Sequence, residues 1–176
     1  LRRFVPGIKK DIDRAGRALG YYLLQSIVAF SEEESCWSMS INIIPGTPVT
    51  MSGIEVNISN DARLFSSVLE NLPLATGDQL NQQLYEQIKT SLSSRAVEVG
   101  FFSARFERSQ LLLDLQDNTA NASIDFDPGE RYRFGSVEIQ PVEELSDAFI
   151  RRFIDFEEEA FYSSSALIAL RNSLND

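Results

Sequence analysis

Histidine is absent from this sequence of 176 residues, and cysteine occurs once, at Cys36. Without histidine the chain has no Ser-His or Cys-His catalysis and none of the commonest zinc sites, because these need an imidazole. A single cysteine cannot form a disulfide within the chain, and nothing near it in the sequence marks it as a nucleophile. No apolar run reaches the roughly 18 residues of a membrane-spanning helix.

Basic residues are also scarce, since 16 Lys and Arg stand against 26 Asp and Glu, for a net charge of −10. A surface of this sign repels phosphate backbones and anionic lipids, so nucleic acid and membrane surfaces are poor partners. Apolar residues make up 43% of the chain and include twelve Phe, which is ample for compact cores. The composition therefore indicates a folded protein whose partners are not polyanions.

What the sequence does contain is an internal repeat. Gly20-Tyr21-Tyr22 recurs downstream as Gly100-Phe101-Phe102, and Pro45-Gly46 recurs as Pro128-Gly129. Ile54-Glu55-Val56 likewise recurs as Val137-Glu138-Ile139. The three pairs share nearly the same spacing. This spacing is too long for the short repeats of solenoid proteins and favours small domains in tandem.

Each copy predicts the same order of elements. An apolar-periodic helix ends at the glycine, which suits the left-handed position after a helix. Two strands follow before the Pro-Gly pair, and the second strand alternates strictly. Its apolar residues are Trp37, Met39, Ile41 and Ile43 in one copy and Ala120, Ala122, Ile124 and Phe126 in the other. Such alternation predicts a sheet with one packed and one solvated face.

Further elements follow from the local patterns. The predicted helices are residues 8–19, a short helix capped by Asn60-Asp61 and stopped by Pro73, a long helix from Thr76 to Val99, and one near 147–155. Thr76 and Gln79 have capping-box spacing. The predicted strands are 21–30, 36–44, 49–58, 102–113, 120–127 and 132–139, with an acidic hairpin turn at 31–35 and a second turn at 114–119.

The repeat therefore predicts an α+β fold of tandem units. Each unit runs strand-helix-helix-strand-strand, as a small mixed sheet with two helices on one face. The predicted domains are the C-terminal part of one unit at 1–47, a complete unit at 48–129 and the N-terminal part of a third at 130–176. No Ser/Gly-rich linker separates them, which favours closely abutted units.

This order of motifs resembles the POTRA (polypeptide-transport-associated) family. The resemblance rests on 18–22, 45–49, 76–78, 99–102 and the run Asp127 to Gly135, and within the family it is greatest to the TamA group. Two positions depart from the family pattern, Glu159 in place of a turn glycine and Val49 in place of an aromatic.

The resemblance implies a location and partners. We expect a scaffold on the periplasmic face of the Gram-negative outer membrane, in a parent protein that continues into a β-barrel. Its partners would be client outer-membrane polypeptides, including autotransporters, and an inner-membrane-anchored, TamB-like protein. We expect no catalytic residue, no metal site and no cofactor.

The predicted binding site is an edge strand, because unpaired backbone N–H and C=O groups can accept an extended client strand. The candidate residues are Phe102, Ala104, Phe106 and Arg108, with Leu24 and Val28 as counterparts in the upstream copy. An equally good interpretation is that Arg105, Glu107 and Arg108 protect this edge against aggregation. The predicted joints between units contain Pro45, Gly46, Pro128, Gly129, Arg131 and Arg133.

Other functions stay open at this point. The POTRA region of a two-partner secretion transporter, or a division-septum protein, would show similar motifs. A carboxylate-based hydrolase would use Asp125, Asp127 and Glu130, but the upstream copy lacks all three acids, so the repeat does not need them. We also expect that the half sheets at the two ends could pair between chains.

Overall fold

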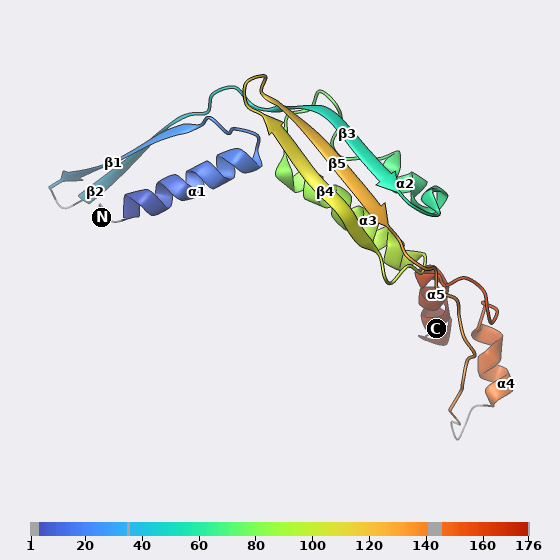
Figure 1. Ribbon diagram of the computed structural model, residues 1–176. Coiled ribbons are helices and arrows are strands. Elements are labelled where there is room, and N and C mark those ends of the chain that lie inside the picture. Colours follow the sequence, from blue (N-terminus) through green and yellow to red (C-terminus); the bar gives the residue numbers. More distant parts are fainter. Residues whose placement is uncertain (1–3, 35, 141–145, 176) are drawn as a thin grey trace. The chain divides into compact units, whose positions relative to one another are not determined.

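The computed structural model describes residues 4–34, 36–140 and 146–175. They form the expected α+β fold, with one sheet of two strands and one of three in the order β3-β5-β4 (Figure 1). The strands are β1 (Gln25–Glu33), β2 (Cys36–Ile44), β3 (Thr50–Ile58), β4 (Arg105–Asp114) and β5 (Thr119–Asp127).

The described helices are mostly short. They are α1 (Val5–Ala18), η2 (Ala62–Phe65), α2 (Ser66–Leu69), α3 (Gln82–Glu98), α4 (Asp147–Ile150), η3 (Arg151–Phe153) and α5 (Ser164–Asn175). In the described part of the chain, no helix combines the length and the apolar content that crossing a bilayer requires.

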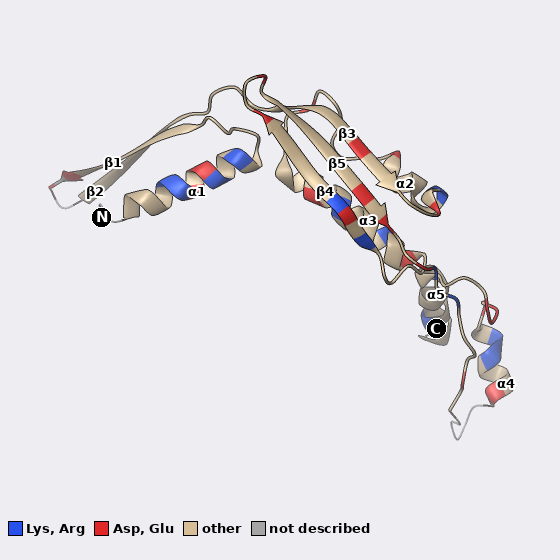
Figure 2. Cartoon of the chain, in the orientation of Figure 1, with Lys and Arg blue, Asp and Glu red and all other residues tan. Residues whose placement is uncertain are grey.

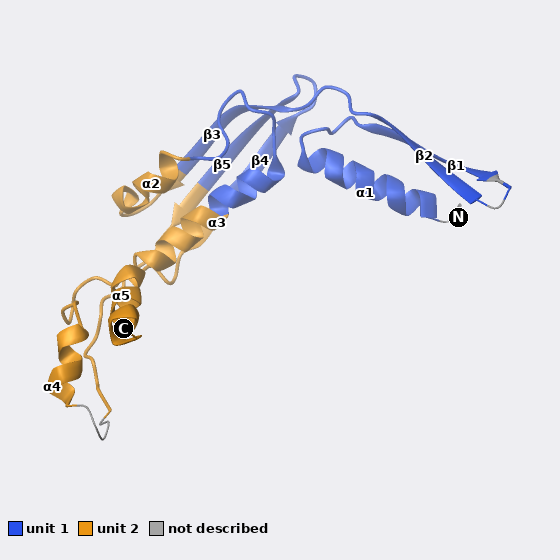
Figure 3. Cartoon of the chain, turned by 180° about the vertical axis from the view of Figure 1, so that it is seen from behind, with its two compact units in different colours: residues 1–56, 72–89, 108–124 blue, residues 57–71, 90–107, 125–176 orange. Residues whose placement is uncertain are grey.

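The chain divides into two compact units (Figure 3). Unit 1 comprises Leu1–Val56, Leu72–Lys89 and Arg108–Ile124, and unit 2 comprises Asn57–Asn71, Thr90–Glu107 and Asp125–Asp176. The division passes through β3, α3, β4 and β5. The three domain ranges taken from the repeat stay a prediction.

In unit 1, α1 lies along the β1–β2 hairpin (Figure 1). The hairpin is antiparallel, with Gln25 opposite Ile44 and Glu33 opposite Cys36. The first strand begins at Gln25 rather than at Tyr21, because the Tyr21 N–H turns back to cap α1 through the Gly16 carbonyl at 2.8 Å. The strand also extends into the predicted acidic turn, of which residue 35 lies outside the described residues.

The apolar face predicted for β2 is not buried. The side chains of Trp37, Met39, Ile41 and Ile43 are 41–56% exposed. A strand buries a face only where other elements cover it, and β2 has a single neighbouring strand, β1, in its sheet. The alternation correctly predicts the strand, but not the packing.

Unit 1 also holds the first part of the three-stranded sheet. The Thr50 N–H donates to the Asn118 carbonyl at 2.9 Å, and the Ser52 hydroxyl donates to the Ala120 carbonyl at 2.9 Å. The accepting residue moves two positions forward along β5 as the donating residue moves two positions forward along β3, so the two strands run parallel. The core of this unit lies between these strands and the first half of α3, and contains Val49, Met51, Leu74, Leu80, Tyr85, Ile88, Ala120, Ala122 and Ile124.

Unit 2 has an aromatic core. Phe65 at the end of η2 is fully buried, with ring centroids 6.0 Å from Phe101 and 5.7 Å from Phe126. The second half of α3 adds Leu92, Ala96 and Val99, all buried. The i, i+4 stripe of the long helix is therefore confirmed at these positions.

Two predicted helix caps are wrong. Asp61 adopts a left-handed conformation with φ of +51° and its side chain makes no capping bond. The long helix begins at Gln82 rather than near Thr76, because Asn81 Oδ1 accepts from the Gln83 N–H at 2.9 Å and from the Leu84 N–H at 3.4 Å. Asn81 is thus the N-cap that satisfies the first turn.

The strand predicted at 132–139 does not form within the described residues. The segment around Arg133 is extended but makes only isolated bridges, of Arg131 with Phe101 and of Arg133 with Phe161. A ladder needs a neighbouring strand along its length, and the described part of the chain supplies none here.

Candidate functional site

The first feature of the site is a junction of three chain segments in unit 1. The Val49 N–H donates to the Gly20 carbonyl at 2.9 Å, and the Leu80 N–H donates to the Val49 carbonyl at 2.8 Å. Gly20 has φ of +87°, and a Cβ added there would lie 2.8 Å from the Leu80 carbonyl oxygen. Glycine is therefore required both for its conformation and for the close approach. We call this junction joint A.

The same junction is built again in unit 2. The Tyr132 N–H donates to the Gly100 carbonyl at 2.8 Å, and the Tyr162 N–H donates to the Tyr132 carbonyl at 3.0 Å. Gly100 has φ of +96°, and an added Cβ would lie 3.0 Å from the Tyr162 Cβ. Its three members occupy the positions of the repeat that correspond to those of joint A. We call this junction joint B.

The predicted Pro-Gly pairs lie beside these joints at matching places. Gly46 has φ of +75° and approaches Leu23, whereas Gly129 has φ of +77° and approaches Ser103. Leu23 and Ser103 occupy the same place relative to the joint glycine. Pro128 is fully buried, and Pro45 lines an apolar cavity of about 310 Å³ against α1. The turn glycines thus serve equivalent corners in the two copies.

One side chain in each joint holds the carbonyl that precedes the joint glycine. The Gln79 amide donates to the Leu19 carbonyl at 2.6 Å in joint A, and the Arg131 Nε donates to the Val99 carbonyl at 2.8 Å in joint B. Leu80, Gln79 and Tyr162 were not predicted as joint residues. The repeat was the available signal, because Leu80 and Tyr162 occupy equivalent positions in it.

Joint B differs in its surroundings. The guanidinium carbons of Arg131 and Arg133 lie 4.2 and 3.9 Å from the centroid of the Phe161 ring. Phe102 packs edge-on against Tyr132 at 5.3 Å and against Tyr162 at 4.9 Å. Phe102 therefore lies in the joint and precedes β4, although the sequence pattern placed it in the edge strand.

The strand in which the sequence predicted a binding edge corresponds to β4, an outer strand of the three-stranded sheet. Ala104 lies just before the strand, Phe106 packs against Phe126 with centroids 5.0 Å apart, and Arg108 is exposed. The side chain of Leu24 packs against α1 near Gly16, and Val28 is half-buried on β1. Phe106 and Leu24 thus contribute packing rather than a free surface.

Charges and apolar groups occupy different parts of β4. Arg105 forms ion pairs with Glu107, at 3.5 Å, and with Asp127. Farther along the strand, Leu112 is 64% exposed and Leu113 is 38% exposed. These charges therefore lie at the start of β4, and farther along the strand Leu111 to Leu113 form an apolar stretch before Asp114.

Two of the acids considered for hydrolysis, Asp125 and Asp127, belong to β5, whose acidic residues are red in Figure 2, and Glu130 follows the strand. Asp125 Oδ1 accepts from the Asn57 amide at 3.0 Å, and Asp127 Oδ1 accepts from the Ser59 hydroxyl at 3.0 Å. The Gly129 N–H bond, then the Ser59 hydroxyl and the Arg105 charge, lower the pKa of Asp127 against a smaller opposing effect of desolvation. These acids join β3 to β5 and close the Pro-Gly corner.

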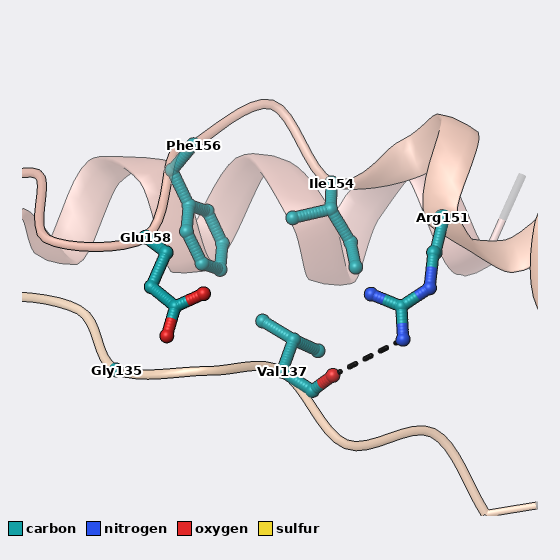
Figure 4. Close-up of a pocket in the computed structure, with 6 residues that line it drawn as sticks. All are labelled: Gly135, Val137, Arg151, Ile154, Phe156 and Glu158. Atoms are coloured by element: carbon teal, nitrogen blue, oxygen red, sulfur yellow. Dashed lines mark hydrogen bonds between the residues drawn. The ribbon is translucent and has the colours of Figure 1, made fainter.

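A small cavity of about 230 Å³ opens in the C-terminal part of unit 2 (Figure 4). It is lined by Gly135, Val137, Arg151, Ile154, Phe156 and Glu158. Arg151 reaches across it to the Val137 carbonyl at 3.4 Å and also pairs with Asp147 at 2.7 Å. Asp125, Asp127 and Glu130 do not line it. Among the described residues, no group of three or more potential ligand side chains is placed to hold a metal ion.

Comparison with known proteins connects this geometry to a family. The POTRA family model, described as "Surface antigen variable number repeat", matches residues 54–129. POTRA3-5 of BamA from Haemophilus influenzae is similar in fold, with a TM-score of 0.51 and 18% identity over 96% of this chain and 68% of that one. BamA from Haemophilus ducreyi lacking POTRA domains 1-3 is 20% identical over 71% of this chain, with a TM-score of 0.48. The chain covers 23% of the length of that second protein.

Proposed function

We propose that the chain is a protein-binding scaffold of an outer-membrane protein assembly factor, because the POTRA family model matches its residues 54–129. POTRA domains of Omp85-family proteins are periplasmic, non-enzymatic scaffolds that bind polypeptides, which supports this assignment. We place the chain on the periplasmic side of the outer membrane.

The single observation that carries the proposal is the position of β4 at the edge of the sheet. An extended client segment can add to such an edge through main-chain bonds, while its alternate side chains contact the host strand. The apolar stretch of β4 from Leu111 to Leu113 suits the alternating apolar residues of a strand that inserts into a membrane barrel. We therefore expect client strands to add along β4.

A more specific assignment rests on the sequence run from Gly129 to Gly135, which resembles the TamA group. It would make autotransporters the clients and a TamB-like, inner-membrane-anchored protein the partner. Joint B supports a special role for this run, because Arg131, Tyr132 and Arg133 all lie in that junction.

The test is an NMR titration of the ¹⁵N-labelled chain with a synthetic peptide of alternating valine and threonine, as a probe for an extended client. We expect the largest shift changes at backbone amides of β4. Proline scanning then separates binding from folding, because successive residues of an edge strand point their N–H groups alternately inward and outward.

Glu107→Pro and Arg108→Pro form the matched pair. One of them should remove an inward ladder bond and lower stability. The other should weaken peptide binding with little change in urea unfolding. Shift changes confined to β1 or β2, or equal loss of binding and stability in both variants, would argue against client addition at β4.

A further inference from the structure

The surface of joint B contains two arginines stacked on one exposed ring. Arg131 and Arg133 both lie over Phe161, whose side chain is 45% exposed. A guanidinium stacked on an aromatic face keeps its N–H donors at its edges, where they match the two oxygens of a carboxylate. The stack therefore orients two cationic groups at the surface before any partner arrives.

Most donors of these arginines are not used by the joint. Arg131 donates through Nε to the Val99 carbonyl, and Arg133 donates through one terminal nitrogen to the Glu159 carbonyl. A guanidinium has five N–H donors. Within residues 4–34, 36–140 and 146–175, no carboxylate forms an ion pair with either arginine.

Joint B also exposes a second set of aromatic rings. Phe102 is 48% exposed and Tyr132 is 50% exposed, and their centroids are 5.3 Å apart. Tyrosine and arginine are among the residues that dominate protein–protein binding energy, and aromatic residues are enriched at interfaces. Tyr132 lies between the two arginines on extended backbone, where successive side chains point to opposite faces, so these rings are separate from the arginine stack on Phe161.

Joint A shows that the junction itself does not need these groups. The positions equivalent to Arg131, Arg133 and Phe161 are Pro48, Thr50 and Gln79. The neutral Gln79 amide alone holds the equivalent carbonyl, and the same backbone bonds form. The second arginine and the exposed ring of joint B therefore serve something other than the backbone junction.

We propose that Arg131, Arg133 and Phe161 form a docking surface for an acidic segment of a partner polypeptide. Carboxylates of the segment bind the guanidinium edges that the stack on Phe161 holds at the surface. This arginine–aromatic patch deepens the proposed function as a protein-binding scaffold and rests on it, but uses a surface other than the β4 edge.

The test uses the full chain and a fluorescein-labelled dodecapeptide. Every second residue of the peptide is serine, and the residues between the serines are glutamate and phenylalanine in turn. The control peptide carries glutamine in place of glutamate. Fluorescence anisotropy should show about tenfold tighter binding of the glutamate peptide, with a difference that shrinks as salt rises. Equal affinity of the two peptides would overturn the proposal.

Variants locate the binding. Arg133→Gln should weaken binding of the glutamate peptide about tenfold, and Arg133→Lys should weaken it by less, because charge remains while the planar stack is lost. The double variant Arg151→Gln/Arg152→Gln removes two exposed charges elsewhere in unit 2 and should leave binding unchanged. Equal losses in the double variant would overturn the assignment to the patch.

Two further measurements separate the alternatives. Amide exchange at Tyr162, whose N–H closes joint B, reports whether Arg133→Gln disturbs the junction. If Arg133→Gln disturbs the junction, the NMR shift changes that the glutamate peptide causes in the unmodified chain show where the peptide binds. Shift changes outside the patch would count against the proposal. Binding to phosphatidylglycerol vesicles that depends on Arg133 would overturn the proposal, because the partner of the patch would then be a membrane surface and not an acidic peptide. Glu107→Pro and Arg108→Pro should both leave this peptide's affinity intact, which distinguishes failure here from failure at β4.

Discussion

β2 and β5 have the same alternating pattern and end in different environments. Ala120, Ala122, Ile124 and Phe126 on β5 are at most 2% exposed, whereas Trp37, Met39, Ile41 and Ile43 on β2 are at least 41% exposed. β5 lies between β3 and β4 in its sheet, whereas β2 has only β1 beside it. An alternating sequence thus specifies which face is apolar, and the neighbouring elements decide whether that face is buried.

The two joints teach the complementary lesson. Joints A and B share their backbone bonds and their left-handed glycines, although the side chains around them differ in charge and size. A backbone junction that depends on glycine and on main-chain bonds tolerates this variation. The variable side chains are then available for other contacts, as we propose for the arginine–aromatic patch.

The largest effect should come from truncating a buried residue of β5. Phe126→Ala leaves a cavity beside Phe65 and Phe106, and should destabilise the chain by about 3–5 kcal/mol in urea unfolding followed by circular dichroism. The matched variant Ile43→Ala on β2 should lower stability by less than about 1 kcal/mol, because Ile43 is largely exposed. Similar losses in both variants would show that the β2 face is covered in solution.

The next effect distinguishes the two requirements for glycine in the joints. Gly20→Ala combines left-handed strain with a collision against a backbone oxygen, and should cost about 2–4 kcal/mol. Gly77→Ala is the control, since Gly77 has φ of +94° with open space around it, and should cost about 1–2 kcal/mol. Thermal unfolding of the two variants measures the difference. Equal values would mean that close packing at joint A is unimportant.

Removing the side-chain bonds compares the joints directly. Arg131→Ala loses a charge-assisted bond to the Val99 carbonyl and should weaken joint B by about 1.5–3 kcal/mol. Gln79→Ala loses a neutral bond to the Leu19 carbonyl and should weaken joint A by about 0.5–1.5 kcal/mol. Hydrogen exchange of the Tyr162 and Leu80 amides reports each joint separately. A larger effect in joint A would reverse the comparison.

A stabilising change is expected at Glu159. This residue has φ of +64°, and it occupies the turn that Gly77 makes in the preceding copy of the repeat. Glu159→Gly relieves a left-handed strain of about 1–2 kcal/mol and adds unfolded-state entropy, for a net gain of up to about 1 kcal/mol. An increase in the melting temperature is expected, and the matched Glu158→Gly should give a decrease.

The smallest effect concerns acid. Because the pKa of Asp127 is lowered by folding, its stabilising contribution is fully present above the usual value of 3.8 and is lost as pH falls through the folded pKa below it. Asp127→Asn should flatten the decline in melting temperature below that pH. Asp117→Asn, in the turn between β4 and β5, should leave the decline unchanged. An unaltered slope in Asp127→Asn would place the acid sensitivity elsewhere.

The local elements were accessible from the sequence because each depends on neighbouring residues. Glycines at 20 and 100 end helices, period-2 alternation specifies β2 and β5, and the regular spacing of the repeat pairs the two joints. The capping residue of α3 was missed because Thr76-Gln79 and Asn81 both have capping chemistry, and only the position of the first turn distinguishes them.

Contacts between distant segments required the tertiary structure. Nothing in the alternation of β2 says that its apolar face stays about half exposed. The extended stretch after Tyr132 lacks, among the described residues, the neighbour that would make it a strand. The stacking of Arg131 and Arg133 on Phe161 joins segments that are well separated in the sequence. Local sequence determines conformation through short-range sterics and hydrogen bonds, whereas burial and surface chemistry depend on which segments meet in space.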